Sequence, residues 1–318
     1  MAFAATPELA SAVTAAGGLG AIGAGFDTTA QLKAHIQTVR TSLKIEAGAP
    51  VPLVIGFIGW ILDMTEPSDD PRLLAILDEQ PTAIWFAFSS SLDKYIAQVH
   101  EHDKKHGRKT FIFAMVNSVE RALHYAPQVD ALVVQGQEAG GHGGSESPPL
   151  LVLLTAVLKA LPAGGPLVIA AGGVSDGSQV AALITMGAHG VVCGTRFLYT
   201  PECCYGPLQK EVLLKAGFNS TVRTLAYDDV GRTNGWPAKH DGHAISNKVM
   251  DDLAEGLSLD ERRARFDESA LKGESDRLVI WAGNAVATVN EIKPASEVLL
   301  QLHDEAVRAL QGASSLLS

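Results

Sequence analysis

The sequence is poor in cysteine, in positive charge and in long apolar runs. Its 318 residues include only three cysteines, Cys193, Cys203 and Cys204, which excludes a disulfide framework and fits a reducing, cytoplasmic compartment. A formal net charge of −10 is unfavourable for binding nucleic acid or anionic membrane surfaces. The longest apolar stretch, PLVIGFIGWIL at 52–62, is too short to span a bilayer. We therefore expect a cytoplasmic protein with neither nucleic acid nor membrane as a partner.

Histidines that could bind a metal are few and poorly placed. His102 and His106 stand one helical turn apart on a charged helix end, where we expect them to be solvated. His240 and His243 fall in a glycine-rich turn that we expect at the surface, although they could reach a substrate. No metal site is predicted from either pair.

What the chain does contain is a regular alternation of apolar runs and amphipathic segments. Hydrophobic residues make up 47% and charged residues 19% of the sequence, which indicates a large core. Nearly continuous apolar strands that alternate with helices predict a parallel sheet covered on both faces. The runs lie at 19–23, 52–58, 82–88, 110–116, 131–135, 166–170 and 190–194.

Seven strands with a helix ahead of the first predict an α/β fold of the (β/α)8 TIM-barrel type. Only MAFAA precedes the first helix, which starts near Thr6, so the first barrel strand is expected to be truncated. An open, doubly wound sheet is the alternative. Beyond residue 200 we find helix-like pieces and a long loop at 227–243, but no strand series. The expected domains are a barrel at 1–200 and 285–318, and an inserted, mainly helical capping domain at 201–284.

Two glycine turns follow neighbouring strands. AAGGVSDG at 170–177 places Gly172 and Gly173 after one strand, and CGTRF at 193–197 places Gly194 and Thr195 after the next. Backbone N–H groups at such turns, with a helix N-terminus beside them, favour an anion, and TIM barrels often bind phosphate there. The turns predict a ligand with a phosphate group, such as flavin mononucleotide (FMN), a sugar phosphate or a nucleotide.

The loop QGQEAGGHGG at 135–144 follows the strand at 131–135 and should face the same mouth of the barrel. Its five glycines and Ala139 would let the backbone lie against a planar ring, and Gln135 offers a donor and an acceptor to the ring edge. Imidazole is a suitable general base near neutral pH, so His142 is the predicted catalytic residue. The alternative is a loop histidine without a catalytic role.

These motifs, together with ATPELASAVTAAGGLGAIGAG at 5–25, resemble those of the nitronate monooxygenases, formerly called 2-nitropropane dioxygenases. The resemblance covers most of residues 1–200 and resumes weakly at 279–295. It implies a TIM barrel with a small capping domain, a non-covalent FMN, and a loop histidine that takes the α-proton of a nitroalkane. Oxygen is then consumed, and a carbonyl compound and nitrite are released. His142 occupies the place of that histidine.

The motifs and the resemblance together assign the cofactor-binding residues. Gly56 stands where many relatives have Asn, and Met115 where some have Lys or Gln, so neither can offer the polar group found in those relatives. Met1 and Ala2 stand where the truncated strand would end. The assigned residues are Met1, Ala2, Gly56, Met115, Gln135, Ala139, Gly140, Gly141, Gly172, Gly173, Val192, Cys193, Gly194 and Thr195.

The function expected from the sequence is an FMN-dependent nitronate monooxygenase that uses O2 and an alkyl nitronate or nitroalkane. The main alternative keeps the flavin but uses NAD(P)H, as in the quinone and enoyl reductases that share this type of loop. Two further alternatives are a lyase or isomerase that binds a sugar phosphate, and a flavin-binding protein without activity. The sequence leaves open whether the chain forms a homo-oligomer.

Overall fold

Seven of the apolar runs form one parallel sheet in the computed structural model, which describes residues 3–315. Every neighbouring pair of strands runs in parallel, which confirms the seven predicted strands. In their order across the sheet they are β1 (Gly20–Gly23), β2 (Val51–Ile58), β3 (Pro81–Ala87), β4 (Phe111–Val116), β5 (Ala131–Gln135), β7 (Leu167–Ala171) and β8 (Gly190–Val192).

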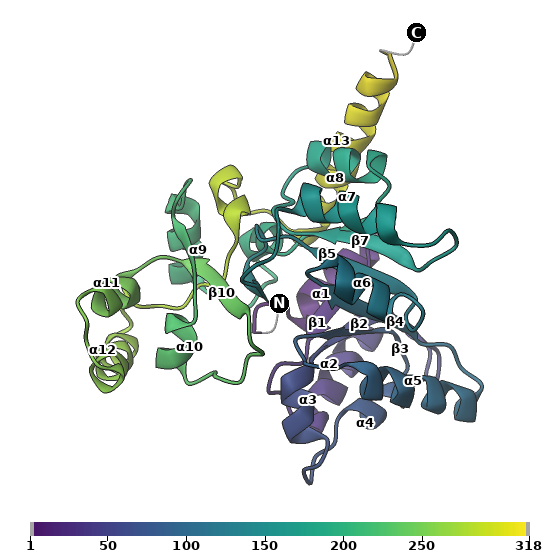
Figure 1. The fold of residues 1–318 in the computed structure, drawn as a ribbon, viewed down its shortest axis with the longest axis horizontal. Coiled ribbons are helices and arrows are strands. Elements are labelled where there is room, and N and C mark those ends of the chain that lie inside the picture. Colours follow the sequence, from purple (N-terminus) through teal and green to yellow (C-terminus); the bar gives the residue numbers. More distant parts are fainter. Residues whose placement is uncertain (1–2, 316–318) are drawn as a thin grey trace.

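Helices precede, connect and follow these strands. Thr6 accepts a hydrogen bond from the Leu9 amide at the start of the first helix, and Asp176 forms a capping box with Gln179. Figure 1 shows the helices packed around the sheet. They are α1 (Pro7–Ala15), α2 (Thr29–Ser42), α3 (Gly59–Thr65), α4 (Leu73–Leu77), α5 (Asp93–His106), α6 (Val119–Tyr125), α7 (Leu150–Ala160), α8 (Gly177–Thr185) and α13 (Ala295–Ser314).

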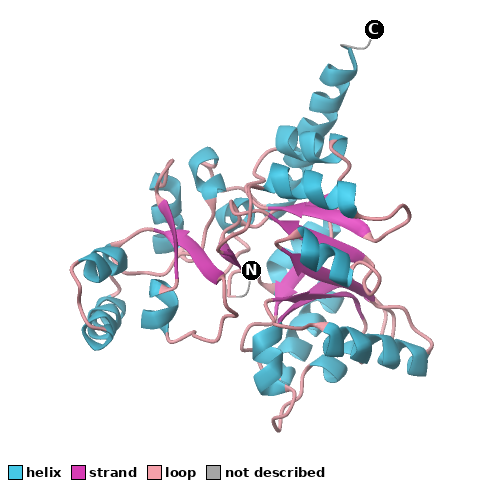
Figure 2. Ribbon diagram, viewed as in Figure 1, coloured by secondary structure: helices cyan, strands magenta, loops and turns pink. Residues whose placement is uncertain are grey.

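The sheet is curled but not closed, which corrects the expectation of an eight-stranded barrel. Across residues 3–315, β1 and β8 each pair with a single neighbour, and no strand precedes α1. Helix α1 packs tightly against the β1 edge, because a Cβ added at Gly20 would lie 2.2 Å from the Ala10 carbonyl oxygen. The architecture is therefore an open, seven-stranded, TIM-like sheet. Figure 2 shows its strands with helices around them.

Buried side chains on both faces explain why the strands are apolar throughout. On one face, strand residues such as Ile55 belong to a large core with helix residues such as Ile36. The other face carries a smaller core of Ala87, Met115, Val133 and Ala171, against which Trp85 and Val192 pack. This second core is the floor on which the functional site described below is built.

Residues 201–284 contain two strands that the sequence did not predict. The strand β6 (Gly141–Gly144) lies inside the glycine loop, and β10 (His240–Ile245) pairs antiparallel with both β6 and β9 (Thr221–Thr224). The expectations of a loop at 141–144 and of an insertion without strands were therefore wrong. Both segments are short and rich in glycine or polar residues, so their strand conformation depends on pairing with each other rather than on an apolar pattern.

The remaining elements of this region are helical and lie apart from the seven-stranded sheet (Figure 1). They are α9 (Pro207–Lys215), α10 (Ala226–Gly231), α11 (Lys248–Ala254) and α12 (Leu259–Lys272), flanked by the short 3-10 helices η1 (Thr195–Tyr199) and η2 (Asn284–Thr288). Tyr227 and Trp281 belong to a separate small core formed by this region. The region therefore has its own buried side chains in addition to the strand that it shares with the glycine loop.

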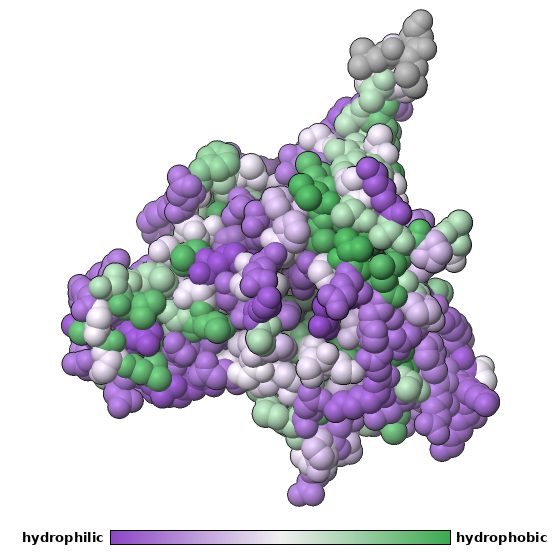
Figure 3. All heavy atoms as spheres, in the orientation of Figure 1, coloured by the Kyte–Doolittle hydropathy of each residue, from purple (hydrophilic) through white to green (hydrophobic). Residues whose placement is uncertain are grey.

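The surface is polar over most of the face seen in Figure 3, except for an apolar patch near α7 and α8. Leu151 and Val152 of α7 are 55% and 60% exposed. Within residues 3–315, no helix combines the length and the apolar character that crossing a bilayer requires.

Candidate active site

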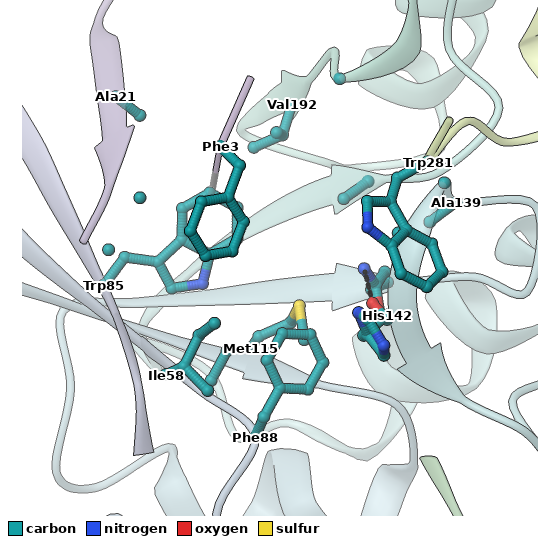
Figure 4. A pocket seen from close by; sticks show the side chains of 18 of the residues that line it. Phe3, Ala21, Ile58, Trp85, Phe88, Met115, Ala139, His142, Val192 and Trp281 are labelled. Carbon is teal, nitrogen blue, oxygen red and sulfur yellow. Dashed lines mark hydrogen bonds between the residues drawn. The ribbon is translucent and has the colours of Figure 1, made fainter. Parts of the chain in front are cut away.

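A cavity of about 270 Å³ lies where the parallel strands end. Parallel strands bring their carboxyl ends to one edge of a sheet, so residues far apart in sequence meet there. Figure 4 shows side chains from several strands and from the glycine loop around this space. The predicted site residues that line it are Gly56, Met115, Gln135, Ala139, Gly140, Gly141, His142, Gly172, Gly173, Val192, Gly194 and Thr195.

Three predicted residues are not among those lining the cavity. Met1 and Ala2 lie outside the described residues. The Cys193 side chain packs against the core between the sheet and its helices, and this burial raises the pKa of its thiol to about 12. Its thiol is therefore protonated at neutral pH and unreactive.

Gly172, Gly173, Gly194 and Thr195 form one wall of the cavity, which we call the glycine rim. They follow the adjacent strands β7 and β8, whose ends pair at Ala171 and Val192. Within residues 3–315, their backbone N–H groups find no acceptor. Four unpaired amides on two neighbouring turns form a cradle for an anion such as phosphate.

Positive charge lies next to this rim. Arg196, directly after Thr195, is 4% exposed, and its Nη1 atom has no hydrogen-bond partner in the described part of the chain. Its Nη2 atom lies 3.9 Å from a Glu291 carboxylate oxygen. Burial lowers the pKa of Arg196, yet a guanidinium stays charged in proteins. The rim is therefore suited to a negative group.

Glycine stands at positions around the cavity for two different reasons. A Cβ added at Gly194 would meet no atom within 4 Å, and one at Gly56 would lie 3.6 Å from its nearest neighbour. A Cβ at Gly140, by contrast, would lie 2.3 Å from the Gly283 amide nitrogen. Gly140 is therefore required by the packing of the chain itself, whereas Gly56 and Gly194 leave space that a ligand can fill.

The side chain of His142 is held by a carboxylate from residues 201–284. His142 lies in β6, opposite Gly242 of β10. Its Nε2 atom is 3.0 Å from both carboxylate oxygens of Asp228, whose side chain is fully buried. A carboxylate can only accept hydrogen bonds, so Nε2 of His142 is the donor. The other ring nitrogen, Nδ1, has no partner within residues 3–315 and is not enclosed.

Asp228 is itself fixed by two further donors. The hydroxyl of Thr233 and the indole Nε1 of Trp236 each donate to its Oδ1 atom at 2.8 Å. With His142, these donors satisfy a buried carboxylate that would otherwise be costly. The imidazole orientation is thus set by a network that reaches 86 residues along the chain.

Aromatic rings surround the imidazole. Trp236 stacks on it with a centroid distance of 3.4 Å and an interplanar angle of 6°. Trp281 lies 4.5 Å away and Phe88 6.5 Å away, centroid to centroid. The indole Nε1 atoms of Trp60 and Trp85, which also line the cavity, are buried without an acceptor. Each is therefore an unsatisfied polar group within the described part of the chain, enclosed beside the cavity.

Two polar residues of the glycine loop have structural partners. The Gln135 amide donates to the His142 carbonyl oxygen at 3.2 Å and accepts from the Asn117 side chain at 3.0 Å. It therefore braces the loop, although we expected both groups to face a ring. Glu138 accepts from the Leu150 amide at 3.0 Å and so caps α7.

Other histidines differ from the sequence expectation. His102 is 7% exposed and bonds to Asp78 rather than to solvent, and with His106 these residues form a cluster that could hold a metal ion. None of the three lines the cavity. His243 is 4% exposed, between the Ala139 carbonyl and the Thr221 hydroxyl, so it is not a surface residue. Burial lowers its pKa.

The sequence analysis did not identify the site residues that come from the stretch 201–284. Asp228, Thr233, Trp236 and Trp281 all come from that stretch, and the last three line the cavity. One signal was available: the sequence has only four tryptophans, and two of them lie in the loop-rich stretch with no predicted core role.

Comparison with known proteins places nearly the whole chain in one family. A family model described as nitronate monooxygenase matches residues 1–305. A nitronate monooxygenase of Metarhizium robertsii is 30% identical, with 94% of this chain and 87% of that protein covered. One from Neurospora crassa is 29% identical, covering 94% of this chain and 85% of that protein.

Solved structures share the fold. FabK from Thermotoga maritima matches with a TM-score of 0.78 and 26% identity, over 99% of this chain and 93% of that one. A nitroalkane oxidase from Streptomyces ansochromogenes matches with a TM-score of 0.76 and 23% identity, over 99% of this chain and 95% of that one.

Proposed function

The chain belongs to the nitronate monooxygenase family of FMN-dependent oxidoreductases, and we propose that it oxidises alkyl nitronates, and nitroalkanes after deprotonation, with O2. The products are a carbonyl compound and nitrite. The observation that carries the proposal is the accessible Nδ1 atom of His142, set by Asp228 in a cavity with a phosphate cradle.

His142 is the general base. Because its Nε2 donates to Asp228, the neutral ring carries its lone pair on Nδ1. That atom takes the α-proton of a nitroalkane, and the resulting imidazolium keeps its Nε2–H bond to the carboxylate. Asp228 is a positioning residue: it fixes the tautomer and stabilises the positive charge that His142 gains.

FMN fits the remaining surface of the cavity. The glycine rim would hold its phosphate, while Gly56 and Gly194 leave room for it. When bound, FMN would accept the electrons of the nitronate and pass them to O2.

Residues 201–284 act as a cap on a body made of residues 1–200 and 285–318. Thr233, Trp236 and Trp281 line the cavity opposite the sheet, which supports this division. The rings exclude water from the imidazole, so the proton that His142 takes is not exchanged freely with solvent.

The test compares a neutral nitroalkane with its preformed nitronate by oxygen uptake, using FMN-loaded protein. Nitroethane must be deprotonated by the protein, whereas ethyl nitronate is already deprotonated. In His142→Gln, whose amide can still donate to Asp228, turnover of nitroethane should fall by about 10²–10⁴-fold, and ethyl nitronate should still react. Equal losses on both substrates, with flavin content unchanged, would remove the assignment of the base.

A second candidate is an NAD(P)H-dependent FMN reductase such as a quinone or enoyl reductase. An enoyl reductase domain from Bacillus amyloliquefaciens has the same fold, with a TM-score of 0.69 and 12% identity, and the nitroalkane oxidase matches with 0.76. The fold therefore does not separate the two reactions. Anaerobic mixing of the FMN-loaded protein with NADH does. Rapid loss of flavin absorbance would support the reductase, and an unchanged spectrum would support the nitronate reaction.

A further inference from the structure

All four tryptophans of the sequence, Trp60, Trp85, Trp236 and Trp281, line one cavity. Aromatic residues make up only 6% of the chain, so this concentration is a property of the site and not of the composition. Figure 4 shows the rings of Trp85, Phe88 and Trp281 directed at the same space as His142. The site therefore offers flat apolar surfaces to whatever group lies beside the imidazole.

Four aromatic side chains that line the cavity form a continuous wall, which we call the aromatic arc. They are Phe26, Trp60, Phe88 and Trp236. Neighbouring rings touch edge to face, with centroid distances of 5.8 Å for Phe26–Trp60, 5.5 Å for Trp60–Trp236 and 5.2 Å for Phe88–Trp236. Gly235 has a φ of +139°, and a Cβ there would lie 2.5 Å from the Trp60 ring. The arc is thus closely packed and pre-formed.

The cavity has almost no charge. Among its lining residues in the described part of the chain there is no Asp, Glu, Lys or Arg, and His142 is the one histidine. Nearby guanidinium groups are engaged elsewhere: Arg223 pairs with Asp241, and Arg121 donates to the Ser89 carbonyl oxygen at 3.1 Å. Arg196 is not among the lining residues, and its Nη2 atom lies 3.9 Å from a Glu291 carboxylate oxygen. A substrate anion beside the imidazole can therefore find only one counter-charge among the lining residues, that of protonated His142.

Negative charge on the protein side adds to this restriction. The buried carboxylate of Asp228 lies behind His142, and the chain as a whole has a formal charge of −10. A nitronate group carries one negative charge, which the His142 imidazolium can balance. A second negative charge on the same substrate would be buried among rings without a partner, which is strongly unfavourable.

We infer that the substituent on the nitro carbon of the substrate is uncharged and apolar, aromatic groups included. Nitronates that also carry a carboxylate are rejected. This inference rests on the proposed function and narrows it to one class of nitro compound. The arc binds the substituent of the nitro carbon, while His142 faces the nitro end. Selection comes from the missing counter-charge, because the rings accept apolar groups of several shapes.

A matched pair of substrates tests the inference: 3-nitropropanoate and its methyl ester, each supplied as the preformed nitronate to the FMN-loaded protein. They share a carbon chain and differ by one charge. We expect kcat/KM for the ester to exceed that for the acid by at least about 100-fold, given the cost of an unpaired buried carboxylate. Equal values, or a preference for the acid, would overturn the inference. Failure of both compounds and of ethyl nitronate would instead refute the proposed function.

Binding can be measured without turnover. The unreactive pair 3-phenylpropanamide and 3-phenylpropanoate should be titrated into the FMN-loaded protein while the visible flavin spectrum is recorded. The amide should perturb the spectrum at concentrations at least about tenfold lower than the acid, because only the acid brings an unpaired charge into the arc. Equal binding of the two would contradict the inference whether or not nitronates are oxidised.

A charge added at the arc should reverse the selection. Phe26 is 46% exposed, so Phe26→Arg is compatible with folding and places a cation at the open end of the arc. We expect the ester-to-acid ratio of kcat/KM to fall by about tenfold or more, since the acid gains a partner. Leu271→Arg is the matched control, because Leu271 is 89% exposed, lies on α12 and does not line the cavity. If the ester-to-acid ratio fell equally in both variants, the cause would be the net charge of the protein, and the role of the arc would be overturned.

Discussion

The glycine rim and the aromatic arc are opposite walls of one cavity, and they are built in opposite ways. The rim consists of residues directly after two neighbouring strands, and its binding groups are backbone amides. The arc consists of side chains from four separate segments, and its rings are held by contacts with one another. A wall made of backbone depends on local turns and can be recognised in the sequence. A wall made of side chains depends on tertiary packing, which a single sequence does not reveal.

The sharpest test of the side-chain wall is Asp228→Asn. The asparagine oxygen can still accept from Trp236, while its NH2 group would donate to Nε2 of His142 and so move the ring proton to Nδ1. We expect kcat/KM for nitroethane to fall by about 100-fold or more, with ethyl nitronate much less affected. Oxygen uptake over a range of pH measures both.

Thr233→Val is the matched control for this prediction. It removes one donor to Asp228 but leaves the bond between Asp228 and His142. The activity of Thr233→Val on nitroethane should fall by less than about tenfold, the worth of a typical hydrogen bond of about 1 kcal/mol, because the bond that sets the tautomer of His142 is retained. If the two variants lost activity equally, and with the same pH profile, Asp228 would have only a structural role.

Gly140→Ala probes a glycine required by the fold. The added Cβ would lie 2.3 Å from the Gly283 amide nitrogen, a backbone atom that cannot move aside easily. We expect the free energy of unfolding to fall by about 1–3 kcal/mol, the usual cost of overpacking, as measured by urea denaturation of the protein without FMN. An unchanged midpoint would mean that the two segments separate readily.

Gly194→Ala probes a glycine of the rim that the fold does not require. Its Cβ meets no protein atom within 4 Å, so the unfolding midpoint without FMN should stay within the error of the wild type. The methyl group would enter the space of the ligand and weaken FMN binding by about tenfold, as measured by flavin fluorescence. Unweakened binding would show that the phosphate lies elsewhere.

The smallest expected effect is on how the free energy of unfolding depends on pH. Burial holds the pKa of His243 below its ordinary value of 6.5, so the unfolded chain binds a proton more readily than the folded one. Stability is therefore complete above about pH 6.5 and is lost as the pH falls through that value towards the lower pKa of the folded state. Chemical denaturation between pH 5 and 7.5, at about half-unit steps, measures this slope.

His243→Gln should flatten that slope. Glutamine does not titrate, and it can replace both hydrogen bonds of the imidazole, to the Ala139 carbonyl oxygen and the Thr221 hydroxyl. Part of the slope should remain, because burial also lowers the pKa of His240. A slope equal to that of the wild type would show that His243 is not the source of the acid sensitivity.

Much of the fold could be predicted because its signals are local. Each strand is a short apolar run, and caps such as Asp176 stand directly before their helices. The number of parallel strands was predicted correctly, but closure into a barrel was not found, because pairing at the edges of a sheet depends on partners that no run of residues specifies. β10 was missed for a related reason: its sequence, HDGHAI, is polar and becomes a strand by pairing with β6 and β9.

The candidate site divides in the same way. Residues next to strand ends, such as Gly173 and Gln135, were placed at the cavity from the sequence alone. The purpose of individual loop residues was harder to predict, because Gly140 and Glu138 look like ligand contacts until Gly283 and Leu150 are seen beside them. Asp228 could not be found, since nothing in the sequence connects it with His142.

The pairing of β6 limits how the substrate specificity of this protein could evolve. It belongs to the loop after β5, yet its hydrogen-bonding partner is β10, from the stretch at 201–284. That stretch is therefore not an interchangeable module, because exchanging it for another would also dismantle the scaffold of the imidazole. New specificities are more accessible through single replacements on the inner face of the existing cap than through recombination of whole segments.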